Sequence, residues 1–313
     1  MARPTAAARP TFRAAPVRVR VPATSANLGP AFDSAGLALA LHDDVVARVA
    51  DGGLVIDVAG EGADRVPRNE RHLVVKAMRA AFRLMGGQPR GLELVCANRI
   101  PHGRGLGSSA AAIVAGIEAA RALVVGGDER MSDAAALDLA HRMEGHPDNV
   151  AAALLGGLTF AWSDAVDSAR AVRHEPGRWL RPVALVPTTQ LKTAKARALL
   201  PDAVPLADAA RAAGRAALLS TALTTEPDLL LAATSDTLHQ EYRRLAYPRS
   251  MALVDVLREQ GIAAVVSGAG PTVLVLARSD DEAQSAQTRA PKWFTAHRLD
   301  VDRGGVEVVP LTT

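Results

Sequence analysis

The chain has 313 residues, of which 49% are hydrophobic and 22% are charged, and its formal net charge is +3. This composition is typical of a soluble globular protein and excludes wholesale disorder. The low net charge and an aromatic content of 3% argue against a nucleic-acid partner. The single cysteine, Cys96, excludes an internal disulfide and a multi-cysteine metal centre.

Apolar runs end well before the roughly 20 residues that span a bilayer, so we expect no membrane partner and a cytoplasmic location. Residues 1–16 are rich in arginine, alanine and proline and contain no acidic residue. Transit peptides share this composition, but the apolar core of a secretory signal is missing. We therefore predict that residues 1–16 form a flexible basic arm.

Periodicity along residues 17–170 predicts strands and helices that together form an N-terminal domain. The polar stretch Ser163–Arg178 marks the predicted boundary of this domain. The predicted strands are Val17–Val21, Val45–Val49, Leu54–Val58, Leu92–Ala97 and Leu158–Trp162. The predicted helices are Arg71–Met85, Ser108–Leu123 and a third that Ser132 caps and that runs to about Met143.

Residues 171–313 are predicted to form a second domain. Strands and helices mix in both halves without a strict βαβ rhythm, which predicts the α+β class. The strands predicted here are Val183–Val186, Ala263–Val266, Val273–Leu276 and Val306–Val309. The predicted helices are Leu206–Ala222, Asp228–His239, Arg249–Gln260 and Asp280–Thr288.

A glycine-rich segment that follows a strand and precedes a helix is the most informative part of the sequence. Three glycines in five positions allow a sharp turn and close approach of a ligand to the main chain. The first N–H groups of the helix lack intrahelical partners and favour a phosphate. The plainer alternative is a turn in which Ser108 is only a helix N-cap. The segment reads Pro101-His102-Gly103-Arg104-Gly105-Leu106-Gly107-Ser108-Ser109-Ala110-Ala111.

Two familiar phosphate-binding motifs do not match this segment. It lacks the Lys-Ser/Thr pair of a Walker P-loop, and Ser108 takes the place of the last glycine of a dinucleotide fingerprint. We therefore predict a loop that binds phosphate through main-chain donors and hydroxyls. Such a loop needs a cation, most simply Mg²⁺ held by a carboxylate.

Four motifs in order along the chain carry a family resemblance. Pro101–Ala111 resembles the central motif of the GHMP small-molecule kinases, a superfamily that includes galactokinase, homoserine kinase and mevalonate kinase. Val21–Asp33 and Glu144–Asn149 are similar to motifs of the homoserine kinases in particular, and Ser267–Thr272 to the third motif of the superfamily. The resemblance covers nearly the whole chain after the arm.

This resemblance implies a two-domain GHMP kinase fold with a ferredoxin-like C-terminal domain and with ATP and substrate in the cleft between the domains. It implies ATP-dependent phosphorylation of the L-homoserine hydroxyl, a step toward threonine. Ala31 and Ala35 stand where the family usually has glycine and a larger apolar residue; we interpret both as tolerated packing changes. The oligomeric state stays open, with a homodimer as one possibility.

The resemblance assigns a partner to each polar group of homoserine. Asp33 matches the family carboxylate that receives the ammonium, and Arg197 and Arg243 match two arginines that bind the carboxylate, a task that suits the planar guanidinium. The plainer alternatives are a turn-capping aspartate, surface arginines and a structural histidine. The remaining residues expected at the substrate are Asn27, His146 and Asn149, which would position the hydroxyl, and Gly270.

Glu144 is the predicted Mg²⁺ ligand, aided by Ser108 or Ser109. A glutamate at a helix C-terminus is electrostatically unfavourable, which favours a functional role. Asn149 matches a position where related kinases have an aspartate base, and an amide cannot accept a proton. Because a loose transition state needs little deprotonation, we predict direct attack by the hydroxyl, with Asp148 as the alternative base. The expected catalytic residues are therefore Ser109, Glu144 and Asn149.

Two other functions compete with this one. Another GHMP kinase would take a sugar or a mevalonate-like substrate, but a neutral sugar needs no paired arginines, and Asn149 replaces the aspartate base. A catalytically inactive relative that binds a ligand and regulates a partner is the second alternative. The intact phosphate loop, Glu144 and the Ser267–Thr272 loop argue against it.

Overall fold

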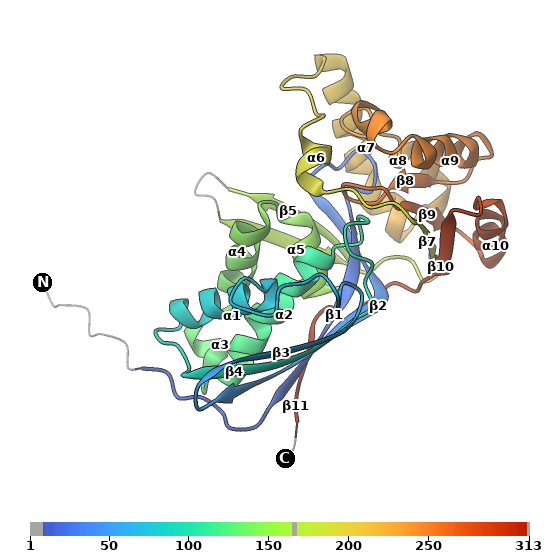
Figure 1. Cartoon of the computed structure of the whole chain (residues 1–313). Coiled ribbons are helices and arrows are strands. Elements are labelled where there is room, and N and C mark those ends of the chain that lie inside the picture. The colour runs from blue at the N-terminus through green and yellow to red at the C-terminus, as the bar shows by residue number, and fades with distance from the viewer. Residues whose placement is uncertain (1–8, 165–167, 312–313) are drawn as a thin grey trace, which may run out of the picture.

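The computed structural model describes residues 9–164 and 168–311, which form two units of mixed helix and sheet (Figure 1). Residues 1–8, half of the predicted basic arm, lie outside these ranges. The part that is described packs on the first unit: the ring of Phe12 meets that of Phe82 edge-on at 5.5 Å, and Phe12 forms a β-bridge with Val124. Within the described residues, no helix is long and apolar enough to cross a bilayer.

The first unit is a sheet that contains seven strands among the described residues, with helices on one face (Figure 1). The strand order is β11-β1-β2-β4-β3, and β5 and β6 continue from β2. The strands are β1 (Val17–Ala26), β2 (Ala35–Ala50), β3 (Gly53–Gly60), β4 (Gly91–Asn98), β5 (Leu158–Ser163), β6 (Ala169–His174) and β11 (Glu307–Pro310). The helices are α1 (Leu73–Leu84), α2 (Ser108–Leu123), α3 (Gly127–Arg130), α4 (Asp133–Glu144) and α5 (Asp148–Leu155).

Helix α2 lies at the centre of the first unit. It is rich in alanine and buried along most of its length, as expected of a helix that is apolar nearly all round. A Cβ on Gly116 would lie 2.4 Å from the carbonyl oxygen of Val74, so glycine lets α1 pack directly on α2. This packing fixes the position of the α2 N-terminus, where the phosphate loop ends.

The second unit is an antiparallel sheet in the order β10-β7-β9-β8. Numbered in chain order, its strands read 4-1-3-2, the ferredoxin-like arrangement, which confirms the predicted fold. The strands are β7 (Arg181–Pro187), β8 (Ala264–Val266), β9 (Val273–Ala277) and β10 (Phe294–Arg298). The helices are α6 (Thr193–Arg197), α7 (Leu206–Thr224), α8 (Leu230–Ala233), α9 (Pro248–Glu259) and α10 (Asp280–Arg289), with 3₁₀ turns η1 (Pro227–Leu229) and η2 (Glu241–Ala246).

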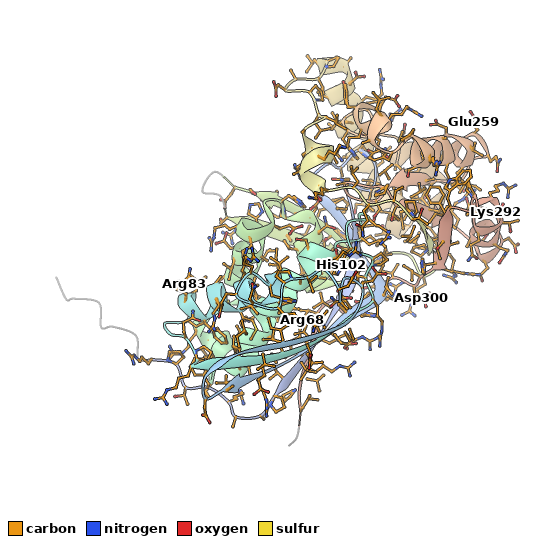
Figure 2. The ribbon with its side chains drawn as sticks, in the orientation of Figure 1. Arg68, Arg83, His102, Glu259, Lys292 and Asp300 are labelled. Carbon is orange, nitrogen blue, oxygen red and sulfur yellow. The ribbon has the colours of Figure 1, made fainter. Side chains whose placement is uncertain are left out.

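The second sheet contributes to two hydrophobic cores. Because successive side chains of a strand point to opposite faces, Val183 and Leu185 of β7 join the core under α9 and α10. Ala184 and Val186 join a core that is continuous with that of the first unit. Charged side chains such as Arg83, Glu259 and Lys292 are exposed and point outward (Figure 2). The two units are thus packed through a shared apolar interior.

The structure differs from the predicted elements at several places, and α3, α5, α6 and β10 were not predicted. The predicted helix Asp228–His239 is wrong beyond Ala233: the Thr234 hydroxyl donates to the carbonyl oxygen of Leu230, and the Asp236 carboxylate accepts three main-chain N–H groups. Strand β2 is sixteen residues long, although only Val45–Val49 was predicted. Strand β6 lies inside the predicted boundary Ser163–Arg178.

The chain returns to the first unit after completing the second. The division predicted at residues 170/171 cuts through β6, and β11 pairs with β1 in the first sheet. The Nε2 of His42 on β2 lies 2.6 Å from a carboxylate oxygen of Asp302. Burial alone raises the pKa of Asp302, but the hydrogen bonds from His42 and from the N–H groups of Gly305 and Gly304 outweigh it and lower the pKa.

Candidate active site

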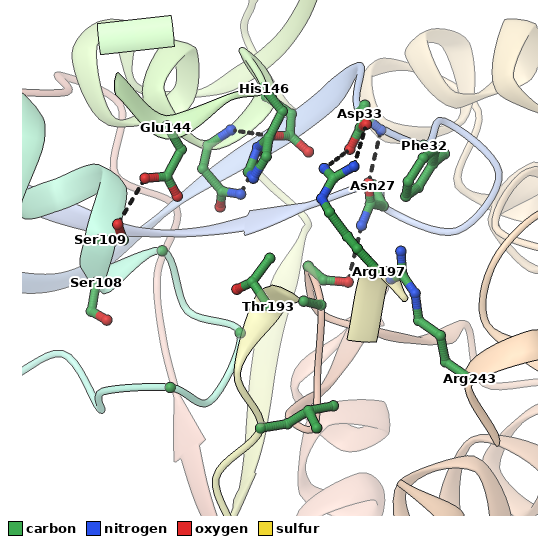
Figure 3. A pocket seen from close by; sticks show the side chains of 18 residues that line it. Asn27, Phe32, Asp33, Ser108, Ser109, Glu144, His146, Thr193, Arg197 and Arg243 are labelled. Carbon is green, nitrogen blue, oxygen red and sulfur yellow. Dashed lines mark hydrogen bonds and ion pairs between the residues drawn. The ribbon is translucent and has the colours of Figure 1, made fainter. Parts of the chain in front are cut away.

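A cleft opens between the two units at the N-terminus of α2 (Figure 3). Twelve of the predicted site residues line it, although they come from segments far apart in the chain. These are Asn27, Asp33, Gly103, Gly105, Gly107, Ser108, Ser109, Glu144, His146, Asn149, Arg197 and Arg243. The remaining lining residues are Phe32, Asp148, Leu191, Thr193, Gly268 and Ala269.

The glycines of the phosphate loop are required by its geometry. Gly107 is the N-cap of α2 with φ +70°, and Ser108 is the first helical residue, so the alternative in which Ser108 caps the helix is wrong. A Cβ on Gly107 would lie 1.9 Å from Oγ1 of Thr24, and one on Gly105 would lie 2.3 Å from the carbonyl oxygen of Ser267. Side chains at these positions would disrupt the loop.

Main-chain hydrogen bonds hold the phosphate loop against three other segments. The N–H groups of Thr24, Leu191 and Thr272 donate to loop carbonyls at 3.1, 2.9 and 3.2 Å. The Ser267 hydroxyl donates to the carbonyl oxygen of Gly105 at 2.6 Å. Because both units contribute these bonds, the loop N–H groups are fixed in direction before any ligand binds.

Other residues of the glycine-rich motif support the loop from behind. Pro101, Leu106 and Ala110 are buried. Arg104 donates from Nε to the carbonyl oxygen of Pro187 at 3.0 Å. Ala111 and His102 line a neighbouring pocket rather than the cleft, and His102 lies where the two units meet (Figure 2).

Asp33 and Arg197 form an ion pair across the cleft (Figure 3). Nη1 and Nη2 of Arg197 donate to the two carboxylate oxygens at 3.0 and 2.5 Å. Burial alone lowers the pKa of Arg197, but the hydrogen bonds and the charge of Asp33 outweigh it and raise the pKa. The residues predicted to take the ammonium and the carboxylate of a substrate therefore satisfy each other in the free protein.

The segment that presents Asp33 has an unusual backbone. Asn27, Leu28 and Asp33 have φ values of +71°, +46° and +55°, a region that non-glycine residues rarely adopt and that clusters at functional sites. The side chain of Asn27 holds this loop: Nδ2 donates to the carbonyl oxygen of Gly268 at 3.0 Å, and Oδ1 accepts from the N–H of Asp33 at 2.9 Å. Asn27 thus joins the first motif to the third.

Gly270 supports the third motif without lining the cleft. Its N–H donates to the carbonyl oxygen of Ser267 at 2.8 Å. A Cβ at this position would lie 2.9 Å from the Tyr247 ring. The neighbouring Gly268 and Ala269 line the cleft instead.

His146, Asp148 and Asn149 form a buried network beside Asp33. Nδ1 of His146 lies 2.6 Å from Oδ1 of Asp148, which also accepts the N–H of Asn149 at 2.7 Å. The Thr24 hydroxyl donates to Oδ1 of Asn149 at 2.8 Å. Burial alone lowers the pKa of His146, but the hydrogen bond and charge of Asp148 and the charge of Glu144 outweigh it and raise the pKa.

Ser109 and Glu144 are the two oxygen-bearing side chains that meet at the start of α2 (Figure 3). The Ser109 hydroxyl donates to Oε2 of Glu144 at 2.7 Å. A hydroxyl and a carboxylate beside a phosphate loop are the donors that Mg²⁺ prefers, so this pair fits the ion. Ser109, rather than Ser108, is the serine bonded to Glu144.

A second pocket adjoins the cleft and shares Ser108 and Ser109 with it. Its walls are largely apolar. Besides the two serines, the polar residues that line it are Asp43, Arg71, His72, Asn98 and His102. Burial lowers the pKa of His72, so this histidine is held in its neutral form. The apolar lining residues are Val45, Val66, Pro67, Leu73, Val74, Ala111, Ala112 and Ala115.

Sequence reasoning missed several of the cleft residues. Phe32 lies inside the first motif and beside Asp33, and Thr193 precedes Arg197 by four residues, the spacing that places two side chains on one face of a helix. Both signals were present in the sequence. Ala269 likewise lies inside the third motif, Ser267–Thr272. Leu191 gave no such signal.

Comparisons with known proteins agree with the geometry. A family model described as the GHMP kinases N terminal domain matches residues 72–157, and one described as GHMP kinases C terminal matches residues 212–296. The homoserine kinase of Streptomyces coelicolor is 61% identical over 306 residues, 98% of each chain. That of Clavibacter michiganensis is 51% identical over 93% of each chain. A crystal structure of homoserine kinase from Cytophaga hutchinsonii superposes with a TM-score of 0.83 at 26% identity, covering 96% of this chain and 98% of the other.

Proposed function

This chain belongs to the homoserine kinases of the GHMP kinase superfamily, and we propose that its cleft carries out their reaction through the residues described above. The enzyme transfers the γ-phosphoryl group of ATP to the hydroxyl of L-homoserine, which yields O-phospho-L-homoserine and ADP. The observation that best supports this assignment is the placement of a helix N-terminus next to the Asp33–Arg197 pair and Arg243. A zwitterionic alcohol and a polyphosphate would meet there.

Homoserine binds by exchanging partners with the Asp33–Arg197 ion pair. Its ammonium takes Asp33, near which ligand atoms of His146 and Asp148 also lie, all within 4.8 Å of one another. Its carboxylate takes Arg197 and Arg243. A molecule with only one of the two charges leaves one member of the pair without a partner, and an unpaired charge in a partly buried site is costly. The pair thereby favours amino acids over simple amines, acids and neutral sugars.

ATP spans the phosphate loop and the adjoining apolar pocket. The triphosphate lies against the loop N–H groups and the start of α2, where main-chain donors and the helix dipole favour anions. The base occupies the pocket between α1 and α2, because a flat ring with few charges suits apolar walls and Ser108 and Ser109 connect the two cavities. Glu144 and Ser109 would hold Mg²⁺, which neutralises phosphate charge when bound.

Asn149 orients the attacking hydroxyl in this proposal. Its Oδ1 accepts from Thr24, and one N–H of its Nδ2 donates to Oδ1 of Asp148 at 3.4 Å. The second N–H of Nδ2 is therefore left to donate to the hydroxyl oxygen. The hydroxyl oxygen forms the new P–O bond, the bond between the β,γ-bridging oxygen and the γ-phosphorus breaks, and the hydroxyl proton passes to the transferred phosphoryl group. Asp148 already accepts hydrogen bonds from His146 and Asn149, so we keep it as an orienting group rather than a base.

Product analysis tests the function directly. The purified protein is incubated with ATP, Mg²⁺ and homoserine, and in parallel with galactose, mevalonate or L-threonine; ³¹P NMR should show a phosphomonoester with homoserine alone. Turnover of a sugar or mevalonate at a similar rate would assign another GHMP activity, and no turnover with any acceptor would support an inactive relative. Asp148→Asn should keep measurable activity. Loss of turnover with homoserine binding intact would make Asp148 the base.

A further inference from the structure

Arg243 is buried without a carboxylate partner, in contrast to Arg197. It is 1% exposed, and no carboxylate in the described residues lies within ion-pair distance of it. Nη1 is 3.4 Å from Nδ1 of His239, and its Cζ is 5.3 Å from the centre of the Phe32 ring. Its Nε has no hydrogen-bond partner among the described residues. Burial lowers the pKa of Arg243, although the nearby Tyr247 hydroxyl opposes the shift.

His239 lies in the turn that precedes η2, the element that carries Arg243, and its ring faces Arg243. Its Nε2 is 2.8 Å from the carbonyl oxygen of Gly29, an atom that can only accept, so Nε2 carries the hydrogen. Nδ1 of the neutral ring is then left as an acceptor for the Arg243 guanidinium. The ring is fully buried, which lowers its pKa and favours this neutral form.

Besides the bond to Gly29, the main chain around His239 and the neighbouring Phe32 ring fix the orientation of the His239 ring. The Asp236 carboxylate accepts the N–H groups of Leu238, His239 and Gln240 at 2.8, 3.0 and 2.7 Å, which holds the main chain. The ring packs against Phe32 with centroids 5.2 Å apart. Phe32 lines the cleft beside Arg197 and Arg243 (Figure 3). His239 therefore links the loop that carries Asp33 to the arginine on the other side.

We propose that His239 is a positioning residue that holds Arg243 in the orientation that receives the substrate carboxylate. This inference rests on the proposed role of Arg243 as a carboxylate ligand. A neutral histidine accepts from the guanidinium without neutralising it, so Arg243 keeps its full charge for the ligand. A carboxylate at the same place would occupy the guanidinium, as Asp33 occupies Arg197 in the free protein.

Two substitutions at position 239 separate the two hydrogen bonds of the ring. His239→Gln keeps an ε nitrogen that can donate to Gly29 but removes the δ acceptor. His239→Asn keeps a δ acceptor toward Arg243 but does not reach Gly29. We expect His239→Gln to weaken homoserine binding roughly tenfold, the size of one hydrogen bond to a charged group, with kcat changed less than about twofold. His239→Asn should retain affinity within about threefold of the parent.

A double-mutant cycle distinguishes positioning from a general structural effect. Homoserine dissociation constants are measured by calorimetry for the parent, His239→Gln, Arg243→Ala and the double variant, with unfolding curves to establish that each is folded. If His239 acts through Arg243, the double variant binds as Arg243→Ala alone. Equal losses for the Gln and Asn variants, or additive losses in the double variant, would overturn the inference. An unchanged constant for Arg243→Ala would refute the proposed carboxylate site as well.

Discussion

Gly107→Ala is a sharp test of the phosphate loop because two separate costs meet at this residue. The φ of +70° is strained for any residue with a side chain, and that strain costs about 1–2 kcal/mol. The added Cβ would also lie 1.9 Å from Oγ1 of the buried Thr24 and 3.2 Å from Oδ1 of Asn149. Displacing Thr24 breaks its hydrogen bond to Asn149, which adds about 1 kcal/mol.

We expect Gly107→Ala to lower the free energy of unfolding by about 2–3 kcal/mol and kcat/KM by about 100-fold, since a shift near 1 Å in an aligned site has that effect. Gly53→Ala is the matched control: its φ is +77°, but nothing lies within 4 Å of the added Cβ. This control should lose stability by strain alone and keep its activity. Urea unfolding and a coupled assay of ADP release measure the two quantities. Equal kinetics for the two variants would refute the argument that the loop is sterically constrained.

Three further predictions follow from the site and from the first sheet. Arg243→Ala should raise the homoserine KM about 10–100-fold. Arg197→Ala should raise it less, because loss of Arg197 also frees the Asp33 carboxylate for the substrate ammonium. A larger increase for Arg197→Ala than for Arg243→Ala in steady-state assays would contradict the ion-pair exchange. If Ser109 and Glu144 share the Mg²⁺ ion, Ser109→Ala should raise the Mg²⁺ concentration required for the half-maximal rate roughly tenfold and leave the homoserine KM unchanged. A Mg²⁺ titration of Ser109→Ala that matches that of the parent would show that Ser109 is not a metal ligand. Because folding lowers the pKa of Asp302, its carboxylate stabilises the fold above its ordinary pKa of about 3.9, and the contribution is lost as pH falls below that value. Urea unfolding of Asp302→Asn and the parent should therefore differ at neutral pH, and the difference should shrink as the pH falls below about 3.9; a constant difference would exclude this linkage.

Local signals predicted the elements that bear the phosphate loop. Three glycines before an alanine-rich run specify a turn and a buried helix, and both lie within one stretch of chain. The pairing of Asp33 with Arg197 could not be predicted in the same way, because 164 positions separate the two residues. The motif match placed both at the substrate, but only the folded structure shows that they bind each other first.

The incorrect or missing elements have physical explanations. The predicted helix Asp228–His239 ignored Thr234 and Asp236, whose side chains compete for main-chain groups and favour a turn. Three of the six residues of strand β6 are polar, and the strand lies at the end of its sheet. Its apolar and polar residues do not alternate along its whole length, so the pattern that identifies strands is incomplete. The first half of β2 was missed because Asp43 and Asp44 interrupt its apolar pattern, although Asp43 accepts the N–H groups of Arg99 and Ile100.

The return of β11 to the edge of β1 has a consequence for how the molecule is assembled during synthesis. Among the described elements β11 is the last to leave the ribosome, so the first sheet waits with one side of β1 unpaired while the whole second unit is made. An unpaired edge is open to association with other chains. Cutting the gene between the two sheets would therefore yield an incomplete N-terminal half. The C-terminal fragment would have to supply β11 to this half. We therefore expect the two fragments to assemble when they are co-expressed, but not when each folds separately.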